Sequence, residues 1–312
     1  MHFADRLDQA ITAKGNPICV GLDPRFDQLP KFIREDCIKR FGKTPQAVAE
    51  AFIIFNKGIV DAVADIVPVC KPQIAFYEEY GWQGIRAYEE TVRYAKSKGL
   101  LVISDAKRGD IGATAVAYAK AHLGDRVDEK DAGFEADALT VNPYMGRDTM
   151  EPYLEVGASA GRGIFVLVKT SNSGSGDLQD LVLVAIKSVA EQVAEIVHSM
   201  GTKCKGSCGL TDVGAVVGAT YPEQAEHLRT LMPDTFFLIP GYGAQGATAK
   251  DAVSGFRKDG RGGIVNNSRL IIFAYQQKEN AHLPETEYAS AARKATQKMA
   301  EELHVALKWR RS

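Results

Sequence analysis

The sequence lacks an excess of charge of either sign. Its 312 residues carry 38 Lys and Arg against 39 Asp and Glu, which gives a formal net charge of −1. Such a balance provides no general attraction to nucleic acid or to an anionic membrane surface. We therefore expect neither nucleic acid nor a membrane as a partner, and any anionic ligand must be recognised by a local group of side chains.

Long apolar runs and paired cysteines are also missing. No stretch approaches the roughly 18 apolar residues of a membrane-spanning helix. Residues 1–17 form an amphipathic helical pattern and not the apolar core of a secretory signal. The five cysteines include no C-x-x-C pair, and an odd number spread through a long chain is not typical of a disulfide framework. We expect a cytoplasmic protein with reduced thiols.

Histidine spacings that bind metal are absent too. The six histidines show neither H-x-H nor H-E-x-x-H spacing, so the sequence predicts no metal site built on histidine. Each histidine is expected to be an ordinary surface or core residue.

Short apolar runs alternate with longer helical patterns. The expected strands are 17–23, 67–72, 100–107, 136–141, 163–169, 213–219, 235–240 and 262–267, and the clearest helical patterns are 45–64, 82–99 and 181–200. Eight apolar strands with intervening helices favour a (β/α)8 TIM barrel over a doubly wound sheet.

Residues 24–44 form a long first connection, expected to hold an extra helix or loop. Residues 284–309 predict a final amphipathic helix that Pro284 begins. No linker interrupts the chain, so we expect one barrel domain over 1–312 with a C-terminal helical extension.

Polar residues end most of the expected strands. Active sites of such barrels lie at the carboxyl ends of the strands. The residues there are Asp23, Lys71, Asp105, Lys107, Asn142, Lys169, Thr170 and Ser171. One charged strand end is more often a structural ion pair, but several together favour a reaction centre. Asp105 and Lys107 are two apart and so expected on one side of the strand. Asp110 follows, either as an N-cap of the next helix or as a member of the centre.

The segment GYGAQG at 241–246 satisfies the G-x-G-x-x-G pattern of dinucleotide-binding folds. It follows the seventh expected strand, however, whereas a dinucleotide-binding unit places the pattern after its first strand. In barrels, the loops after strands seven and eight frequently hold a phosphate group. Gly241, Gly243 and Gln245 from one loop, with Ser268 and Arg269 from the next, suit that task, and Arg269 would be a bidentate clamp. Tight turns alone are the alternative explanation of these glycines.

Taken together, these segments resemble the orotidine 5′-phosphate decarboxylase family. The matching motifs are GLDPR at 21–25, CKP at 70–72, SDAKRGDIGAT at 104–114, PGYGAQG at 240–246 and NNSR at 266–269. They occur in the family's order over residues 17–270. The long first connection and the C-terminal extension are similar to the longer bacterial-type branch.

The resemblance implies decarboxylation of orotidine 5′-phosphate to UMP without a cofactor, by a homodimer with shared sites. Lys71, Asp105, Lys107 and the partner's Asp110 would form the charged catalytic array, and Lys107 would protonate C6. The implied substrate-binding residues are Asp23, Ile111, Thr114, Ser171, Asn172, Pro240, Gly241, Gly243, Gln245, Ser268 and Arg269, with Thr114 acting from the partner chain. The segment 169–177 varies among branches of the family.

Two alternatives stay open at this point. A related barrel class keeps a D-x-K-x-x-D motif but uses a divalent metal to stabilise an enediolate, as sugar-phosphate lyases and synthases do. A non-catalytic barrel would bind a nucleotide with the same groups and not react. Loss of activity in a chelator would favour the metal-dependent alternative. Binding of UMP without any turnover would favour the non-catalytic alternative.

Overall fold

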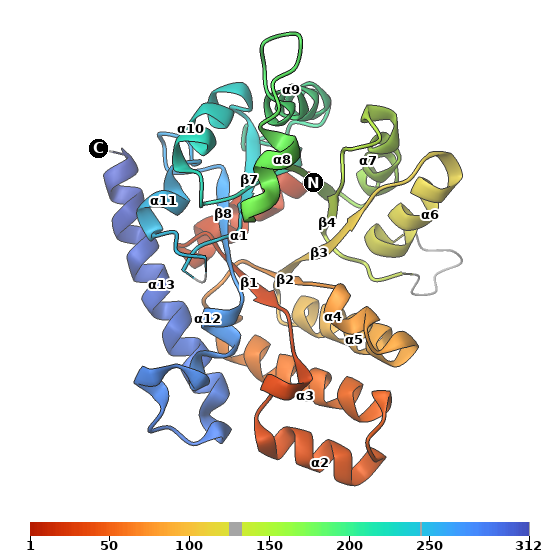
Figure 1. Cartoon of the computed structure of the whole chain (residues 1–312), viewed down its shortest axis with the longest axis vertical. Coiled ribbons are helices and arrows are strands. Elements are labelled where there is room, and N and C mark those ends of the chain that lie inside the picture. Colours follow the sequence, from red (N-terminus) through yellow and green to blue (C-terminus); the bar gives the residue numbers. More distant parts are fainter. Residues whose placement is uncertain (125–132, 244, 312) are drawn as a thin grey trace.

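The chain folds into a closed barrel of eight parallel strands that follow one another in sequence order (Figure 1). The computed structural model describes residues 1–124, 133–243 and 245–311. The strands are β1 (Ile18–Leu22), β2 (Val69–Pro72), β3 (Leu101–Arg108), β4 (Ala138–Val141), β5 (Gly163–Lys169), β6 (Thr211–Val217), β7 (Thr235–Ile239) and β8 (Gly263–Asn267). Each lies within an expected range or extends one by a single residue or two, and the TIM-barrel prediction is confirmed.

Helices surround the barrel and fill its connections. They are α1 (Phe3–Lys14), α2 (Lys31–Phe41), α3 (Pro45–Val63), α4 (Ala75–Glu78), α5 (Gly81–Ser97), α6 (Gly112–Leu123), α7 (Glu151–Ala158), α8 (Gly176–Gln179), α9 (Val189–Gly201), α10 (Pro222–Leu231), α11 (Ala249–Val253), α12 (Arg269–Ile272) and α13 (Tyr288–Arg311). The long first connection holds α2, as expected. Among the helices that the structure describes, none is both long and apolar enough to cross a membrane.

Successive residues of each strand pack on different sides of the barrel wall, which explains why the strands are apolar throughout. In β1, Ile18 and Val20 belong to the core between barrel and helices, whereas Cys19 points into the barrel interior. Both sides are buried, so a polar residue within a strand would lose water on either side. Polar residues are therefore concentrated at the strand ends.

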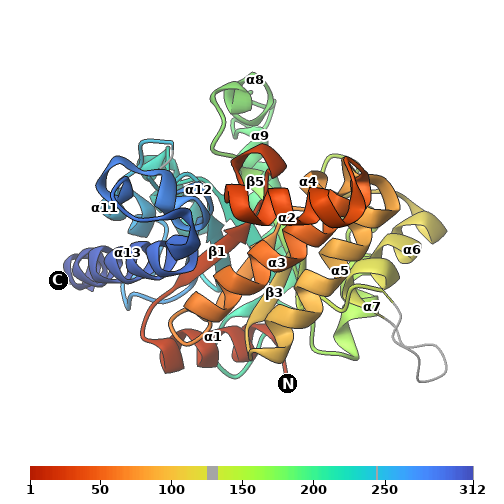
Figure 2. The ribbon, with the colours of Figure 1, turned by 90° about the horizontal axis from the view of Figure 1, so that it is seen from below.

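Helix α1 closes the amino ends of the strands. The ring of Phe3 packs edge-on against that of Phe165 with centroids 5.9 Å apart, and the backbone N–H of Ala4 donates to Asp212 (2.9 Å) near the start of β6. Figure 2 shows α1 at one end of the barrel and α8 at the opposite end. The carboxyl ends are thus the open end of the barrel.

The C-terminal helix α13 takes the eighth place in the outer ring. It packs against α3, which follows β1, and against α11, which follows β7. Its first residue, Tyr288, stacks on Phe55 with centroids 5.2 Å apart. The helix begins at Tyr288 and not at Pro284, because a 3-10 turn at Glu285–Glu287 precedes it.

The prediction of one helix over 181–200 is wrong in its first part. Helix α9 begins at Val189, after a capping box in which the Ser188 hydroxyl accepts from the Glu191 N–H and the Glu191 carboxylate accepts from the Ser188 N–H. Upstream, Val182 pairs with Ser188 in an antiparallel bridge, and Ile186 has φ 57°, which a helix does not allow. The apolar side chains of 181–186 mimic a helical stripe but lie exposed, Val184 and Ile186 most of all.

Candidate active site

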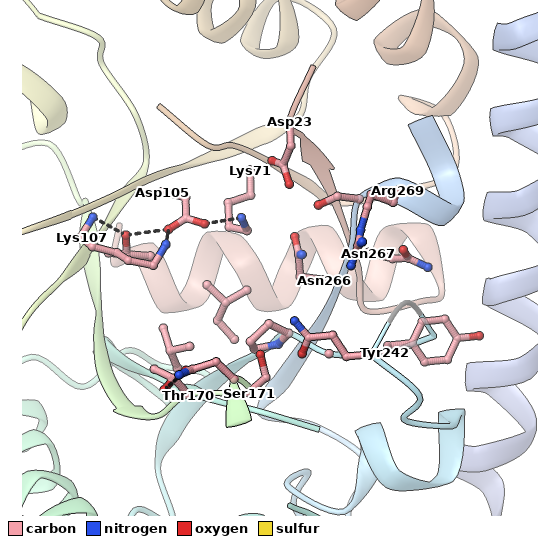
Figure 3. Close-up of a pocket in the computed structure, with 18 of the residues that line it drawn as sticks. Asp23, Lys71, Asp105, Lys107, Thr170, Ser171, Tyr242, Asn266, Asn267 and Arg269 are labelled. Carbon is pink, nitrogen blue, oxygen red and sulfur yellow. Dashed lines mark hydrogen bonds and ion pairs between the residues drawn. The ribbon is translucent and has the colours of Figure 1, made fainter. Parts of the chain in front are cut away.

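A cavity of about 450 Å³ opens among the carboxyl ends of the strands. Figure 3 shows the charged side chains of β2 and β3 at one end and Arg269 at the other. The predicted residues that line it are Asp23, Lys71, Asp105, Lys107, Thr170, Ser171, Asn172, Pro240, Gly241, Gln245, Ser268 and Arg269. The strand ends thus bring residues from all parts of the sequence into one cavity.

Asp105 lies between two lysines. Its Oδ2 accepts from Lys71 Nζ at 2.5 Å, and its Oδ1 accepts from Lys107 Nζ at 2.6 Å (Figure 3). Asp105 and Lys71 are 6% and 5% exposed, whereas the Lys107 side chain is 45% exposed. A buried carboxylate with two cationic partners is stable only as a complete group, because loss of either partner leaves uncompensated charge.

Burial and pairing act in opposite directions on these pKa values. Burial alone would raise the pKa of Asp105, but the two lysines outweigh it and hold the pKa below its usual range. Burial would lower the pKa of Lys71, but Asp105 and Asp23 outweigh it and raise that pKa. Asp105 and Lys71 are therefore both charged at neutral pH.

Asp23 faces the cavity from the end of β1. Burial raises its pKa, against the opposing effects of Lys71 and of a hydrogen bond from Ser268. One carboxylate oxygen, Oδ1, is buried without a hydrogen-bond partner. A buried acceptor without a partner is costly, so this oxygen is available to a hydrogen-bond donor that enters the cavity.

The other end of the cavity is formed by the loops after β7 and β8. Gly241 has φ 104°, a left-handed conformation that favours glycine, and Gln245 follows in the same loop. Ser268 and Arg269 come from the start of α12. The Arg269 guanidinium gives this end a positive charge and several N–H donors, which suits an anion.

Comparison with known proteins agrees with this geometry. Residues 16–283 match the model of the orotidine 5′-phosphate decarboxylase / HUMPS family. The chain belongs to this family. It is 45% identical over 304 residues to the orotidine 5′-phosphate decarboxylase of Rhodopirellula baltica, with 97% of this chain and 99% of the relative covered. It is 42% identical over 299 residues to that of Clostridium novyi, with 96% and 97% covered. The solved structure of Leishmania donovani OMP decarboxylase is similar at 30% identity, with a TM-score of 0.73 and 99% of each chain covered.

Three predicted residues of this decarboxylase-family chain lie outside its own cavity. Asp110, Ile111 and Thr114 sit where β3 leads into α6, and Ile111 is 61% exposed. Asp110 is not the N-cap of α6: Ile111 holds that position, and the Asp110 carboxylate accepts from the Ile111 N–H at 2.8 Å.

Three other predicted positions have local partners instead. Gly243 lines an adjoining cavity between its loop and α13. Lys169 is buried and donates to Asp180 at 2.7 Å, so it is a structural ion pair and does not line the cavity. Asn142 accepts from the Tyr144 N–H at 3.0 Å and shapes the turn after β4.

Some cavity residues were not predicted from the sequence: Arg25, Phe76, Thr140, Tyr242, Asn266 and Asn267. Arg25 lies within the GLDPR motif, Tyr242 within PGYGAQG, and the two asparagines within NNSR, so the motifs contained a signal for these four. Thr140 is inside an apolar strand and gives no such signal. Over the described ranges, no three His, Cys, Asp or Glu side chains are grouped to hold a metal ion.

Proposed function

We propose that this protein decarboxylates orotidine 5′-phosphate to UMP and carbon dioxide without a cofactor. The observation that carries the proposal is the pairing of Asp105 with Lys71 and Lys107 at one end of a cavity that has Arg269 at the other. A nucleotide with its base toward the lysines and its phosphate toward Arg269 fits this polarity. Family membership and relatives of that name over nearly the whole chain support the same activity.

Lys107 would act at the reacting carbon. When the bond from C6 to the carboxylate breaks, its electron pair stays on C6 and carbon dioxide leaves. The Lys107 ammonium stabilises that carbanion and then gives C6 a proton, which the lysine regains from water. Opposite charges about 4 Å apart interact by roughly 4 kcal/mol at an intermediate dielectric constant, before desolvation is subtracted. Asp105 and Lys71 hold the array charged, and Asp105 repels the incoming carboxylate.

The remaining cavity residues would bind the rest of the substrate. Asp23, with its unpaired oxygen, suits the ribose hydroxyls. Ser171, Asn172 and Pro240 suit the pyrimidine. Gly241, Gln245, Ser268 and Arg269 suit the phosphate, with Gly243 supporting their loop. Phosphate contacts far from C6 can contribute to transition-state stabilisation by closing loops over the base.

We further propose a homodimer in which Asp110, Ile111 and Thr114 complete the partner's site. These residues are outside their own cavity, and a 61% exposed isoleucine suits a protein interface. Tyr144 and Met145, which follow the neighbouring strand β4, are also exposed, and the end of the Met145 side chain lies beside Gly109, the residue before Asp110. The balanced charge and five free cysteines suit a cytoplasmic enzyme that binds no nucleic acid.

The test is release of carbon dioxide from orotidine 5′-phosphate with and without a chelator. We expect turnover to be the same in both. Turnover that disappears with chelator and returns with a divalent metal would favour the metal-dependent sugar-phosphate chemistry of this family. Stoichiometric UMP binding without any carbon dioxide would favour a non-catalytic nucleotide-binding barrel.

A further inference from the structure

Thr140, on β4, contacts the charged array although it belongs to no motif. It is 1% exposed and lines the cavity. Its Oγ1 accepts from the backbone N–H groups of Ala106 (3.0 Å) and Lys107 (2.9 Å) and donates to Asp105 Oδ1 (3.1 Å). One hydroxyl thus contacts three consecutive residues of the catalytic segment.

These contacts occur where the pairing of β3 and β4 is irregular. Ser104 pairs with Leu139 and Arg108 with Val141, so β3 advances four residues while β4 advances two. Within this bulge Lys107 has φ 50°, a left-handed conformation that non-glycine residues rarely adopt. Such a backbone persists only where its surroundings hold it. The two N–H groups that meet the Thr140 hydroxyl belong to this segment.

The hydrogen-bond capacity of the hydroxyl is fully used. A threonine hydroxyl has one proton and two lone pairs. The two backbone N–H groups use the lone pairs, and the proton goes to Asp105 Oδ1 at 3.1 Å in preference to the Ser104 carbonyl at 3.5 Å. Asp105 Oδ1 also accepts from Lys107 Nζ at 2.6 Å. Thr140 therefore fixes both the backbone of Lys107 and the carboxylate that pairs with its ammonium.

We propose that Thr140 is a positioning residue for the reaction, which holds the β3 bulge so that the Lys107 ammonium reaches the reacting carbon. This inference rests on the proposed decarboxylation. It differs from a packing role, because it requires the hydroxyl and not only the volume of the side chain. Valine has the same shape and suits a strand, so Thr140→Val removes the hydroxyl selectively.

The experiment compares Thr140→Val with Thr140→Ser. We expect Thr140→Val to lower kcat about 100-fold, the scale on which a displacement of about 1 Å acts, with UMP affinity within about threefold of wild type. Thr140→Ser keeps the hydroxyl and should restore most of kcat. Thr211→Val is the matched control: Thr211 is a buried strand threonine at the amino end of the barrel, where its hydroxyl donates to the Val213 carbonyl. Its kcat should equal that of wild type.

Crystal structures of the variants provide a readout that does not depend on activity. Thr140→Val should lose the left-handed backbone of Lys107 or its contact with Asp105, and Thr140→Ser should keep both. The proposal is overturned if Thr140→Val retains kcat and this geometry, or if the serine variant is as slow as the valine variant.

Absence of turnover in wild type would reject the proposed function, and the structures would still decide the role of Thr140. If the valine variant does not fold, Thr140→Cys, with its weak thiol donor, carries the same expectation.

Discussion

At the scale of single residues, Lys107 unites the features that the proposed reaction needs. Its ammonium is paired with Asp105 at 2.6 Å, yet the side chain is 45% exposed and lines the cavity. We expect Lys107→Ala to lower kcat by at least about a thousandfold, because the general acid alone contributes roughly 10²–10⁴. UMP binding should stay nearly unchanged, since ribose and phosphate contacts remain. Carbon dioxide release and UMP titration measure both, with the exposed Lys258→Ala as control. Near-normal turnover would reject Lys107 as the proton donor.

The charged residues Asp105 and Lys107 could be predicted from the sequence. Thr140, which hydrogen-bonds to both of them, could not. Asp105 and Lys107 stand out because charge at the end of an apolar strand is rare without a reason. Strand alternation placed both on one side, but their contact in fact depends on a bulge held by Thr140. Threonine is common in strands, so nothing in the sequence distinguishes Thr140 from an ordinary strand residue.

Substitution of Arg269 tests whether the opposite end of the cavity binds the phosphate. We expect Arg269→Ala to raise KM and to lower kcat/KM about ten- to a hundredfold, since charged hydrogen bonds contribute about 1.5–3 kcal/mol. Steady-state kinetics with orotidine 5′-phosphate measures the change. Arg40→Ala is the control, because Arg40 lies on α2 in an exposed pair with Asp36. An unchanged kcat/KM in Arg269→Ala would remove the phosphate assignment.

His122 gives the fold a dependence on pH. It is buried, its Nδ1 lies 2.7 Å from Ser104 Oγ, and burial, with a smaller effect of Arg108, lowers its pKa to about 3. The unfolded chain takes up this proton near pH 6.5. Between about pH 6.5 and pH 3 the unfolded state therefore binds more protons, so stability falls as pH falls, by up to about 1.4 kcal/mol per pH unit.

Urea unfolding at several pH values from about 7.5 to 4.5 measures this dependence. We expect the free energy of unfolding to decline with acid in wild type, and to decline less steeply in His122→Gln, which has no proton to gain. Asp105, whose pKa is lowered in the folded state, changes the stability with pH only below the pKa of an unfolded aspartate, about 4. Equal slopes in the two proteins would contradict the assignment to His122.

At the scale of elements, strands were easier to predict than helix starts. A barrel strand is buried on both sides, so a short apolar run predicts it directly. Over 181–200 an apolar stripe suggested one helix, although local hydrogen bonding decides where the helix begins. The Ser188 and Glu191 capping box stops α9 at its amino end, and the preceding residues form an exposed turn.

The position at which α9 begins predicts whether Ser188→Ala destabilises the protein. As an N-cap, Ser188 should contribute about 1 kcal/mol, so Ser188→Ala should lower the free energy of unfolding by about that amount. If the helix ran through 181–200, Ser188 would be in its interior, and alanine would be neutral or stabilising. Ser199→Ala, in the last turn of α9 and away from its amino end, is the control and should not destabilise. Urea denaturation of both variants distinguishes the two helix boundaries.

At the scale of the whole molecule, the C-terminal helix is part of the ring around the barrel. The sequence alone suggested an extension, because ring order depends on contacts far apart in the chain. In the folded chain α13 packs on both α3 and α11, and the Tyr242 hydroxyl donates to Glu302 of α13. The loop after β7, which lines the cavity, is thus connected to the last helix.

The assembly of the whole molecule determines whether Asp110 serves its own site or the partner's site. Mixed dimers of two variants test this. We expect Lys107→Ala and Asp110→Ala homodimers to be nearly inactive. If Asp110 serves the partner's site, a dimer of one variant with the other has one site with both lesions and one with neither. Random pairing makes half of the dimers mixed, so activity should recover to roughly a quarter of wild type. If Asp110 serves its own chain, every site keeps one lesion and nothing recovers. Activity that stays flat after exchange, with mixed dimers confirmed by mass, would therefore reject the shared site and leave the proposed decarboxylation intact.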